Sequence, residues 1–199
     1  MAKLVNWHSF EAKLKEKRIL LFSPLDITRI FGVSKTAATF LVHRYTKRGF
    51  IVRAKQGLYC FADALPPEHY LANKLYEPSY VSLESALSYH RIIPETVYEI
   101  TSVTPKSSRR FETLGKVFTY HTIKKIAFTG YFLEKRGGFS FIIAEPEKAF
   151  VDTLYLRMLN GEKPLRRFNK EKLNKEKAFR YAKVFGNDRI IGIVKRSLL

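Results

Sequence analysis

The sequence is poor in the features that mark secreted and membrane proteins. Its 199 residues include a single cysteine, Cys60, which excludes an internal disulfide and gives no indication of a metal site. The longest apolar stretches, such as FSFIIA at residues 139–144, are far too short to cross a bilayer. The opening segment, MAKLVNWHSFEAKLKEK, lacks the apolar core and cleavage site of a signal peptide. We therefore expect a cytoplasmic protein with no membrane partner, in which Cys60 is a small buried side chain.

Acidic residues are also scarce. The chain has 36 Lys and Arg against 18 Asp and Glu, a formal net charge of +18. Residues 1–62 hold 12 basic and 3 acidic side chains, residues 63–160 hold 12 and 11, and residues 161–199 hold 12 and 4. Two basic ends thus flank a nearly neutral middle. This distribution favours a polyanionic partner, with nucleic acid first, although a basic composition can also serve solubility alone.

The first part of the chain has the pattern of short helices. Apolar residues recur at helical spacing from Trp7 onward, which predicts a helix over residues 6–17. A second helix is predicted after Ser23, because serine is a favourable N-cap and Pro24 fits the first helical position. This helix ends at Gly32, since glycine adopts the backbone conformation that commonly terminates a helix.

A third helix follows after a very short turn. Ser34 can cap it, and neither Gly nor Pro interrupts the sequence until Gly49. Such a tight connection between two helices is typical of a helix-turn-helix. One side of the third helix is apolar and consists of Ala38, Leu41, Val42 and Tyr45. The opposite face is short, polar and basic and includes Lys35, Thr36, Thr39, His43 and Lys47. Small side chains allow close approach to the floor of a DNA major groove, and lysines can meet phosphates.

After Gly49 the pattern changes to that of strands. FIVRA and GLYCF are short β-type runs around Lys55-Gln56-Gly57, which predicts a hairpin with a basic tip. Helix, helix-turn-helix and basic hairpin in this order predict a winged helix. Such a module can also be a small structural core or a protein-docking unit. The concentration of positive charge on the helix face and the hairpin tip favours DNA binding.

Residues 63–69, DALPPEH, predict a domain boundary, because two prolines interrupt regular structure where the charge balance changes. We therefore expect a winged helix-turn-helix domain over residues 1–62 and a second domain over residues 63–199. The second has the pattern of an α+β fold with a mostly antiparallel sheet. It combines a helix capped by Ser82, with Ser85 at an exposed helix position, and a second helix opened by Pro146. The β-type runs are residues 98–104, 116–123, 126–135 and 138–144, and two more helices follow near 170–185 and 188–198.

Three segments together resemble a known family. GVSKTAATFLVHRYTKRGFIVRAKQGLYCF is similar to the N-terminal winged helix of AbiEi-type antitoxins. YVSLESALSYHRIIPETVYEITSVTP and IAEPEKAFVDTLY resemble the domain that follows it in that family. The resemblance extends to about residue 160. It implies the antitoxin of a type IV toxin-antitoxin system, which represses its own operon by binding promoter inverted repeats. It also implies that the second domain counters a nucleotidyltransferase-like toxin without a stable complex.

The resemblance also implies which residues read DNA. Those that match the family pattern are Ser34, Lys35, Thr36, Thr39, Arg44, Lys47, Arg53, Lys55 and Gln56. Phe40 departs from it, because a polar or basic residue is common there. Its ring could pack on a thymine methyl group or stay out of the groove. The basic C-terminal end lies beyond the match, and we expect it to add electrostatic affinity for DNA.

Two other classes of function are compatible with parts of the sequence. A metal-dependent nuclease would suit the charge, but Glu145 and Glu147 flank Pro146 and fit the N-terminus of a helix better than a metal site. The five histidines show no ligand spacing, and no phosphate-binding glycine motif occurs, so we expect no enzyme, metal or cofactor. Aromatic residues of the second domain could instead line a pocket for a metabolite, which would make the protein a ligand-responsive regulator, although aromatic residues at strand and helix spacing more often belong to the core.

Overall fold

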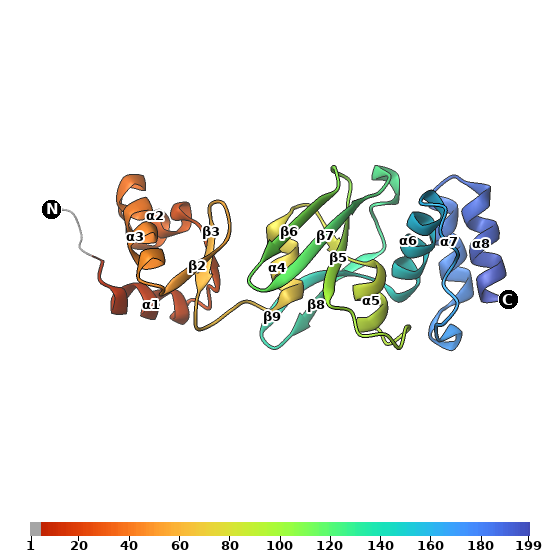
Figure 1. The fold of residues 1–199 in the computed structure, drawn as a ribbon, viewed down its shortest axis with the longest axis horizontal. Helices are drawn as coiled ribbons and strands as arrows, with labels where there is room; N and C mark the ends of the chain where they lie inside the picture. The colour runs from red at the N-terminus through yellow and green to blue at the C-terminus, as the bar shows by residue number, and fades with distance from the viewer. Residues whose placement is uncertain (1–4) are drawn as a thin grey trace. The chain divides into compact units, whose positions relative to one another are not determined.

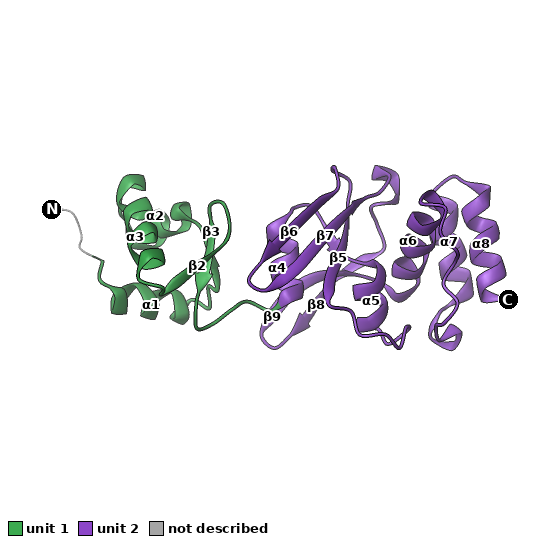
Figure 2. Cartoon of the chain, viewed as in Figure 1, with its two compact units in different colours: residues 1–67 green, residues 68–199 purple. Residues whose placement is uncertain are grey.

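The computed structural model describes residues 5–199. It contains two compact units, Met1–Pro67 (unit 1) and Glu68–Leu199 (unit 2) (Figures 1 and 2). The division between residues 67 and 68 lies within the segment 63–69 that the sequence indicates as a boundary. Unit 1 extends a few residues past the predicted end at residue 62, because those residues still contact it. Ala64 packs against the hydrophobic core of unit 1, and the Asp63 carboxylate lies 3.4 Å from the Lys15 ammonium. None of the helices in the described part of the chain has the length and apolar composition of a membrane-spanning segment.

Unit 1 consists of three helices and a small antiparallel sheet. In chain order the elements are α1 (Trp7–Glu16), β1 (Leu21–Phe22), α2 (Pro24–Phe31), α3 (Lys35–Lys47), β2 (Ile51–Lys55) and β3 (Leu58–Phe61). The strand order is β1-β3-β2, with Leu21 opposite Cys60 and Val52 opposite Cys60 on the other side. Strand β1 was not predicted, because two residues are too few to show the alternation of a strand.

Ser23 and Gly32 bound α2 as the sequence predicts, whereas the cap of α1 by Asn6 was not predicted. The Ser23 hydroxyl accepts a hydrogen bond from the Asp26 N–H, and the Asp26 side chain accepts one from the Ser23 N–H, which completes a capping box. Gly32 ends α2 in the left-handed conformation with φ of 66°. The Asn6 side chain caps α1 by accepting a hydrogen bond from Ser9 N–H. Local side-chain hydrogen bonds therefore define where these helices begin and end.

Unit 2 is an α+β fold around a six-stranded mixed sheet. Its elements are α4 (Glu68–Leu75), β4 (Tyr80–Val81), α5 (Leu83–Tyr89), β5 (Glu99–Thr104), β6 (Arg109–Thr113), β7 (Lys116–Thr122), η1 (Lys125–Ala127), β8 (Tyr131–Arg136), β9 (Phe139–Ala144), α6 (Pro146–Leu159), η2 (Lys170–Lys172), α7 (Lys175–Val184) and α8 (Asp188–Leu198). The strand order is β6-β7-β5-β4-β9-β8. Pairs β4–β5, β6–β7 and β8–β9 are antiparallel, whereas β5–β7 and β4–β9 are parallel. The sheet is therefore mostly antiparallel, as predicted.

The centre of this sheet is completed by a side chain. Strand β4 is so short that it pairs with β9 only at Val81 and Ile143. Next to this pair, the buried Asn73 amide from α4 takes the place of a strand. Its Oδ1 accepts a hydrogen bond from the Ile142 N–H at 2.6 Å, and its Nδ2 donates to the Ile142 carbonyl at 3.2 Å. Both main-chain groups of Ile142 are thereby satisfied.

The basic C-terminal end is part of unit 2 and not an appended tail. Helices α6, α7 and α8 contact one another in succession (Figure 1). The apolar side of α7 and α8 is buried and consists of Ala178, Ala182, Ile190, Val194 and Leu198. Burying this side leaves the lysines and arginines of the same helices on the exposed side. Residues 161–199 therefore form a packed helical layer of unit 2 and also carry a surplus of positive charge.

Three sequence predictions for unit 2 are corrected. Ser82 precedes α5 but does not cap it, because its hydroxyl donates to the Asp152 carboxylate at 2.9 Å. The Ser85 N–H instead donates to Oγ1 of Thr101 at 3.1 Å, so a neighbouring strand supplies the cap, and Ser85 is buried where an exposed position was predicted. Residues 126–130 do not extend strand β8, since 125–127 form a 3-10 turn.

Candidate nucleic-acid interface

Helix α3 begins at a well-formed cap. The Ser34 hydroxyl accepts a hydrogen bond from the Ala37 N–H at 3.2 Å, so this side chain is committed to the helix N-terminus. Two residues separate α2 from Ser34, and Gly32 makes this tight turn possible through its positive φ. The remaining free N–H groups at the start of α3 point out of the helix with a partial positive charge. This end of the helix is suited to an anionic partner.

An aromatic core holds α3 in place. The Tyr45 hydroxyl donates to the Val5 carbonyl at 3.0 Å, and burial raises the pKa of Tyr45 above its ordinary value. The Trp7 ring lies 5.0 Å from the Tyr45 ring and 4.4 Å from the Phe50 ring, measured between centroids. These rings lie on α1, on α3 and at the start of the hairpin. They therefore pack against one side of α3 and leave its other side exposed to solvent.

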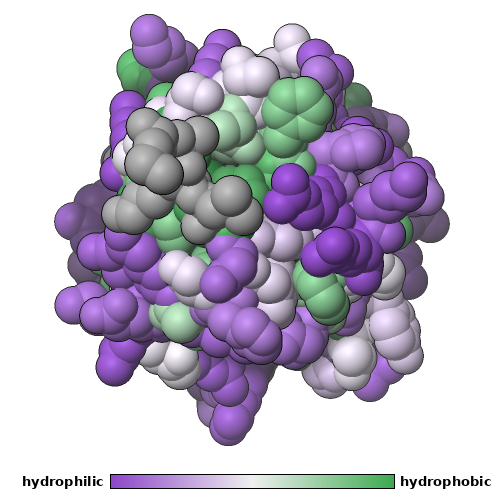
Figure 3. All heavy atoms as spheres, turned by 90° about the vertical axis from the view of Figure 1, so that its left-hand side faces the viewer, coloured by the Kyte–Doolittle hydropathy of each residue, from purple (hydrophilic) through white to green (hydrophobic). Residues whose placement is uncertain are grey.

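The outward side of α3 carries most of the predicted DNA-binding residues. Five exposed side chains line a single hollow there: Lys35, Thr36, Thr39, Phe40 and His43. The Thr39 hydroxyl donates to the Lys35 carbonyl at 3.0 Å, which leaves its oxygen free to accept a hydrogen bond. Figure 3 shows one face of unit 1, where hydrophilic side chains predominate and hydrophobic ones form small separate patches.

Positive charge on α3 is not neutralised by neighbouring residues. The helix contains no Asp or Glu, and Arg44 and Lys47 lie exposed in its last turn, outside the hollow. Within residues 5–199, no ion pair involves Lys35, Arg44 or Lys47. Three acidic side chains of unit 1 are engaged elsewhere, since Glu11 and Asp63 contact Lys15 at 2.6 and 3.4 Å and Asp26 belongs to the α2 cap.

The hairpin β2–β3 forms the predicted wing. Lys55 lies opposite Leu58, so the connecting turn consists of Gln56 and Gly57. Arg53 and Gln56 are exposed, Lys55 is half-buried, and the strand register shifts between Arg53 and Lys55. The site residues therefore fall on two elements: seven on or next to α3, and three on the wing. Only Lys35, Thr36, Thr39 and His43 are brought together with Phe40 in one hollow.

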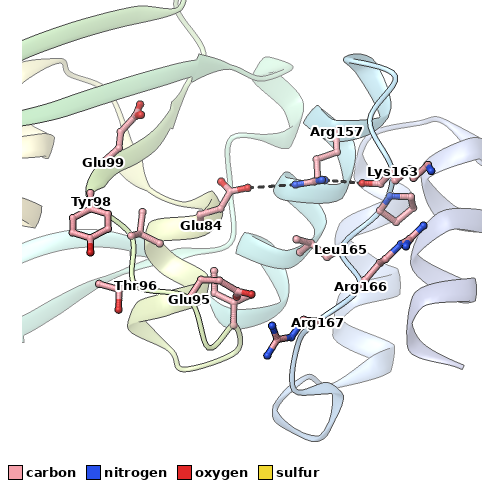
Figure 4. A pocket seen from close by; sticks show the side chains of 13 residues that line it. Glu84, Glu95, Thr96, Tyr98, Glu99, Arg157, Lys163, Leu165, Arg166 and Arg167 are labelled. Atoms are coloured by element: carbon pink, nitrogen blue, oxygen red, sulfur yellow. Dashed lines mark hydrogen bonds and ion pairs between the residues drawn. The ribbon is translucent and has the colours of Figure 1, made fainter.

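Unit 2 contains a separate open cavity of about 670 Å³ (Figure 4). Tyr98 and Glu84 lie on one side of it, and Leu165 and Arg167 on the other. Arg157 spans the gap, because its Nη1 lies 4.0 Å from the Glu84 carboxylate and its Nε donates to the Lys163 carbonyl at 2.8 Å. No sequence motif pointed to this cavity, since its residues come from segments far apart in the chain.

The acidic residues considered as a nuclease motif take part in helix packing. Glu145 precedes α6 and lies 2.9 Å from the Lys177 ammonium of α7, and it accepts a hydrogen bond from the Tyr181 hydroxyl. Glu147 is buried and accepts a hydrogen bond from the Asn174 N–H at 3.0 Å. Both carboxylates thus join α6 to α7. In the described part of the chain, no group of three or more His, Cys, Asp or Glu is arranged to hold a metal ion.

Comparisons with known proteins relate the chain to one fold. No family model matches the sequence, and no curated protein matches it. The crystal structure of the RV2827C protein from Mycobacterium tuberculosis is similar, with a TM-score of 0.50 and 14% sequence identity. The similarity covers 100% of this chain and 82% of that one. At this level of identity the two proteins share a fold, and their functions are not thereby linked.

Proposed function

We propose that this protein is a DNA-binding transcriptional repressor in which α3 enters a major groove and the β2–β3 wing contacts the adjacent backbone. The observation that carries the proposal is the outward face of α3. It begins at a capped helix N-terminus, contains short polar and basic side chains, and has no acidic residue. A recognition helix needs these properties, because it has to approach base edges and tolerate the phosphates on both sides.

Binding measurements with substituted proteins test this assignment. Lys35→Ala and Thr39→Ala are expected to reduce the preference for a selected duplex over random DNA, since both side chains lie in the hollow of α3. Lys55→Ala is expected to weaken binding to both duplexes alike, as a phosphate contact does. Lys135→Ala, an exposed lysine of unit 2, is the matched control. Equal losses from all four substitutions would rule out a reading role for α3.

We further propose that the repressor is the antitoxin of a type IV toxin-antitoxin system. The support is the resemblance of residues 32–61, 80–105 and 143–155 to AbiEi-type antitoxins. In this proposal unit 2 counters a nucleotidyltransferase-like toxin without a stable complex, and unit 1 regulates the operon through inverted repeats. The test is co-expression with a nucleotidyltransferase-like protein encoded beside this gene. Restored growth supports the antitoxin role. Persistent toxicity contradicts that role and leaves only the repressor proposal.

The cavity of unit 2 favours a second candidate, a metabolite-responsive repressor. It has a volume of about 670 Å³ and combines apolar side chains with Arg157 and Glu84. A pocket of this size and composition is suitable for a small polar molecule. A metabolite that raises the unfolding temperature of the wild type but not of Leu165→Glu, and that changes DNA affinity, would support this candidate over the antitoxin role.

A further inference from the structure

Phe40 projects from the outward face of α3 instead of joining the core. Its exposed fraction is 66%, whereas its neighbours Leu41 and Val42 are 5% and 4% exposed. The core cluster of unit 1 contains four residues of α3 and does not include Phe40. Phe40 therefore does not contribute to the packing that stabilises the helix. A large apolar ring that faces water costs free energy that burial against a partner would recover.

The surroundings of Phe40 restrict the kind of partner. The other side chains of the same hollow are Lys35, Thr36, Thr39 and His43. A partner that covers the ring therefore also meets an ammonium group, two hydroxyls and an imidazole. A purely apolar surface would leave these polar groups without hydrogen bonds, which is unfavourable. A second copy of this face would place lysine against lysine, and like charges repel.

DNA offers the matching combination. Its major groove presents hydrogen-bond acceptors between two lines of phosphate, and the one apolar group on its base edges is the C5-methyl group of thymine. We propose that Phe40 contacts a thymine C5-methyl group and is a specificity-determining residue of α3. This inference rests on the proposed function, because it assigns a base group to the helix that the proposal places in the groove.

Replacing thymine by deoxyuridine isolates the predicted contact, since the two bases pair identically and differ only by the methyl group. The probe is the duplex that the wild-type full-length protein selects from a random-sequence library. Each thymine of this duplex is replaced in turn, and affinity is measured by fluorescence anisotropy at fixed salt. At one thymine per half-site, we expect the wild type to lose about fourfold in affinity, which corresponds to the burial of one methyl group.

The substitution of Phe40 completes the test. Phe40→Ala is expected to bind thymine and deoxyuridine duplexes equally at that position, while Phe40→Leu keeps part of the difference. Leu159→Ala removes an exposed apolar residue of unit 2, 58% exposed, and is expected to behave as the wild type. Trp7 fluorescence checks that unit 1 of each variant is folded, because Trp7 is the only tryptophan of the chain.

The outcomes separate this inference from the proposed function. Two results would overturn the role of Phe40 alone while the protein still binds a selected sequence. In the first, Phe40→Ala keeps the full preference for thymine over deoxyuridine. In the second, no thymine of the duplex is sensitive to loss of its methyl group. A wild-type protein that selects no sequence overturns both. A change in oligomeric state by sedimentation for Phe40→Ala, with the thymine preference intact, assigns the ring to a protein contact and also overturns the inference.

Discussion

Lys148 and Asp152 form an ion pair on α6 in which both side chains are only 1% exposed. The Asp152 carboxylate also accepts hydrogen bonds from the Tyr80 hydroxyl at 3.0 Å and the Ser82 hydroxyl at 2.9 Å. Burial raises the pKa of Asp152 and lowers the pKa of Lys148, because removal from water disfavours the charge on each. The pair joins α6 to the centre of the sheet, and each buried charge is neutralised only by the other.

Removing one member of this pair is expected to destabilise unit 2 strongly. Lys148→Met should lower the free energy of unfolding by about 3–5 kcal/mol, since it leaves a buried carboxylate without its cation. Adding Asp152→Asn should recover much of this loss, because the amide oxygen can still accept from Tyr80 and Ser82. Chemical denaturation followed by circular dichroism measures both. Lys116→Met, which removes an exposed ion pair with Glu68 in unit 2, is the control and should cost less than about 1 kcal/mol. A double variant no more stable than Lys148→Met would contradict this account.

Gly130 is expected to tolerate no side chain. A Cβ atom at this position would lie 2.6 Å from Cε1 of Tyr181, and the backbone φ is +74°. Gly115 has a nearly equal φ of +72° with nothing within 4 Å of the added atom. Gly115→Ala should therefore cost about 1 kcal/mol for backbone strain alone. Gly130→Ala should cost about 1–3 kcal/mol more, because it also forces Tyr181 from its place. Equal unfolding free energies for the two variants would show that Tyr181 moves without cost.

The stability of unit 2 is expected to fall in mild acid through His69. Burial lowers the pKa of His69 below its ordinary value of 6.5, and Arg136 adds to this effect while Glu68 opposes it. The unfolded chain therefore binds the proton more readily than the folded one. The contribution to stability is complete above the unfolded pKa and is lost as the pH falls from there through the folded pKa.

Replacing His69 tests that pH dependence. His69→Phe keeps the ring contact with Phe141, whose centroid lies 5.0 Å away, and removes the titrating group. Unfolding followed by circular dichroism should depend less on pH in this variant than in the wild type across the mildly acidic range. Trp7 fluorescence, which reports unit 1, should respond to pH alike in both proteins. Parallel pH profiles for the circular dichroism transitions would count against His69.

Charge substitution is the suitable test of the basic C-terminal end. Deleting residues 161–199 would expose the surface of α6, since α7 and α8 pack on it. Lys172, Lys175 and Lys183 are exposed and form no ion pair within the described residues. Changing all three to Gln should reduce the slope of log affinity against log salt by about 0.9 for each phosphate that these lysines neutralise in the wild type.

The control is a variant that loses three positive charges outside the C-terminal end. Arg109, Lys125 and Lys135 are exposed residues of the nearly neutral middle of the chain. Their replacement by Gln should leave the salt slope close to that of the wild type if the C-terminal end binds DNA. Identical slopes for the C-terminal variant and the wild type would show that residues 161–199 do not touch the phosphates.

The local parts of unit 1 could be predicted from the sequence because their causes are local. Ser23, Ser34 and Gly32 act on hydrogen bonds and backbone angles within a few residues of their own positions. The apolar stripe of α3 follows from helical periodicity, and its four members are buried as predicted. The hairpin around Gln56 and Gly57 likewise depends on adjacent residues. The same periodicity placed the candidate DNA-binding side chains on the outward face.

Features that depend on distant residues required the tertiary structure. Strands β1, β4 and β6 are defined by the strands beside them, and two of the three are too short to have a pattern of their own. Ser82 has the sequence of a helix cap, yet its hydroxyl reaches a carboxylate that lies 70 residues further along the chain. The cavity at Arg157 and the burial of Lys148 arise in the same way.

The amino-acid sequence was sufficient to predict the winged-helix order of unit 1, the α+β character of unit 2 and the surplus of positive charge at both ends. Caps, turns and periodicity act over a few residues, so they can be recognised in a linear chain. The tertiary structure was needed to show that the basic C-terminal helices pack on α6 and that the Ser82 hydroxyl donates to Asp152. Both depend on which surfaces meet, and the chain order alone does not specify that.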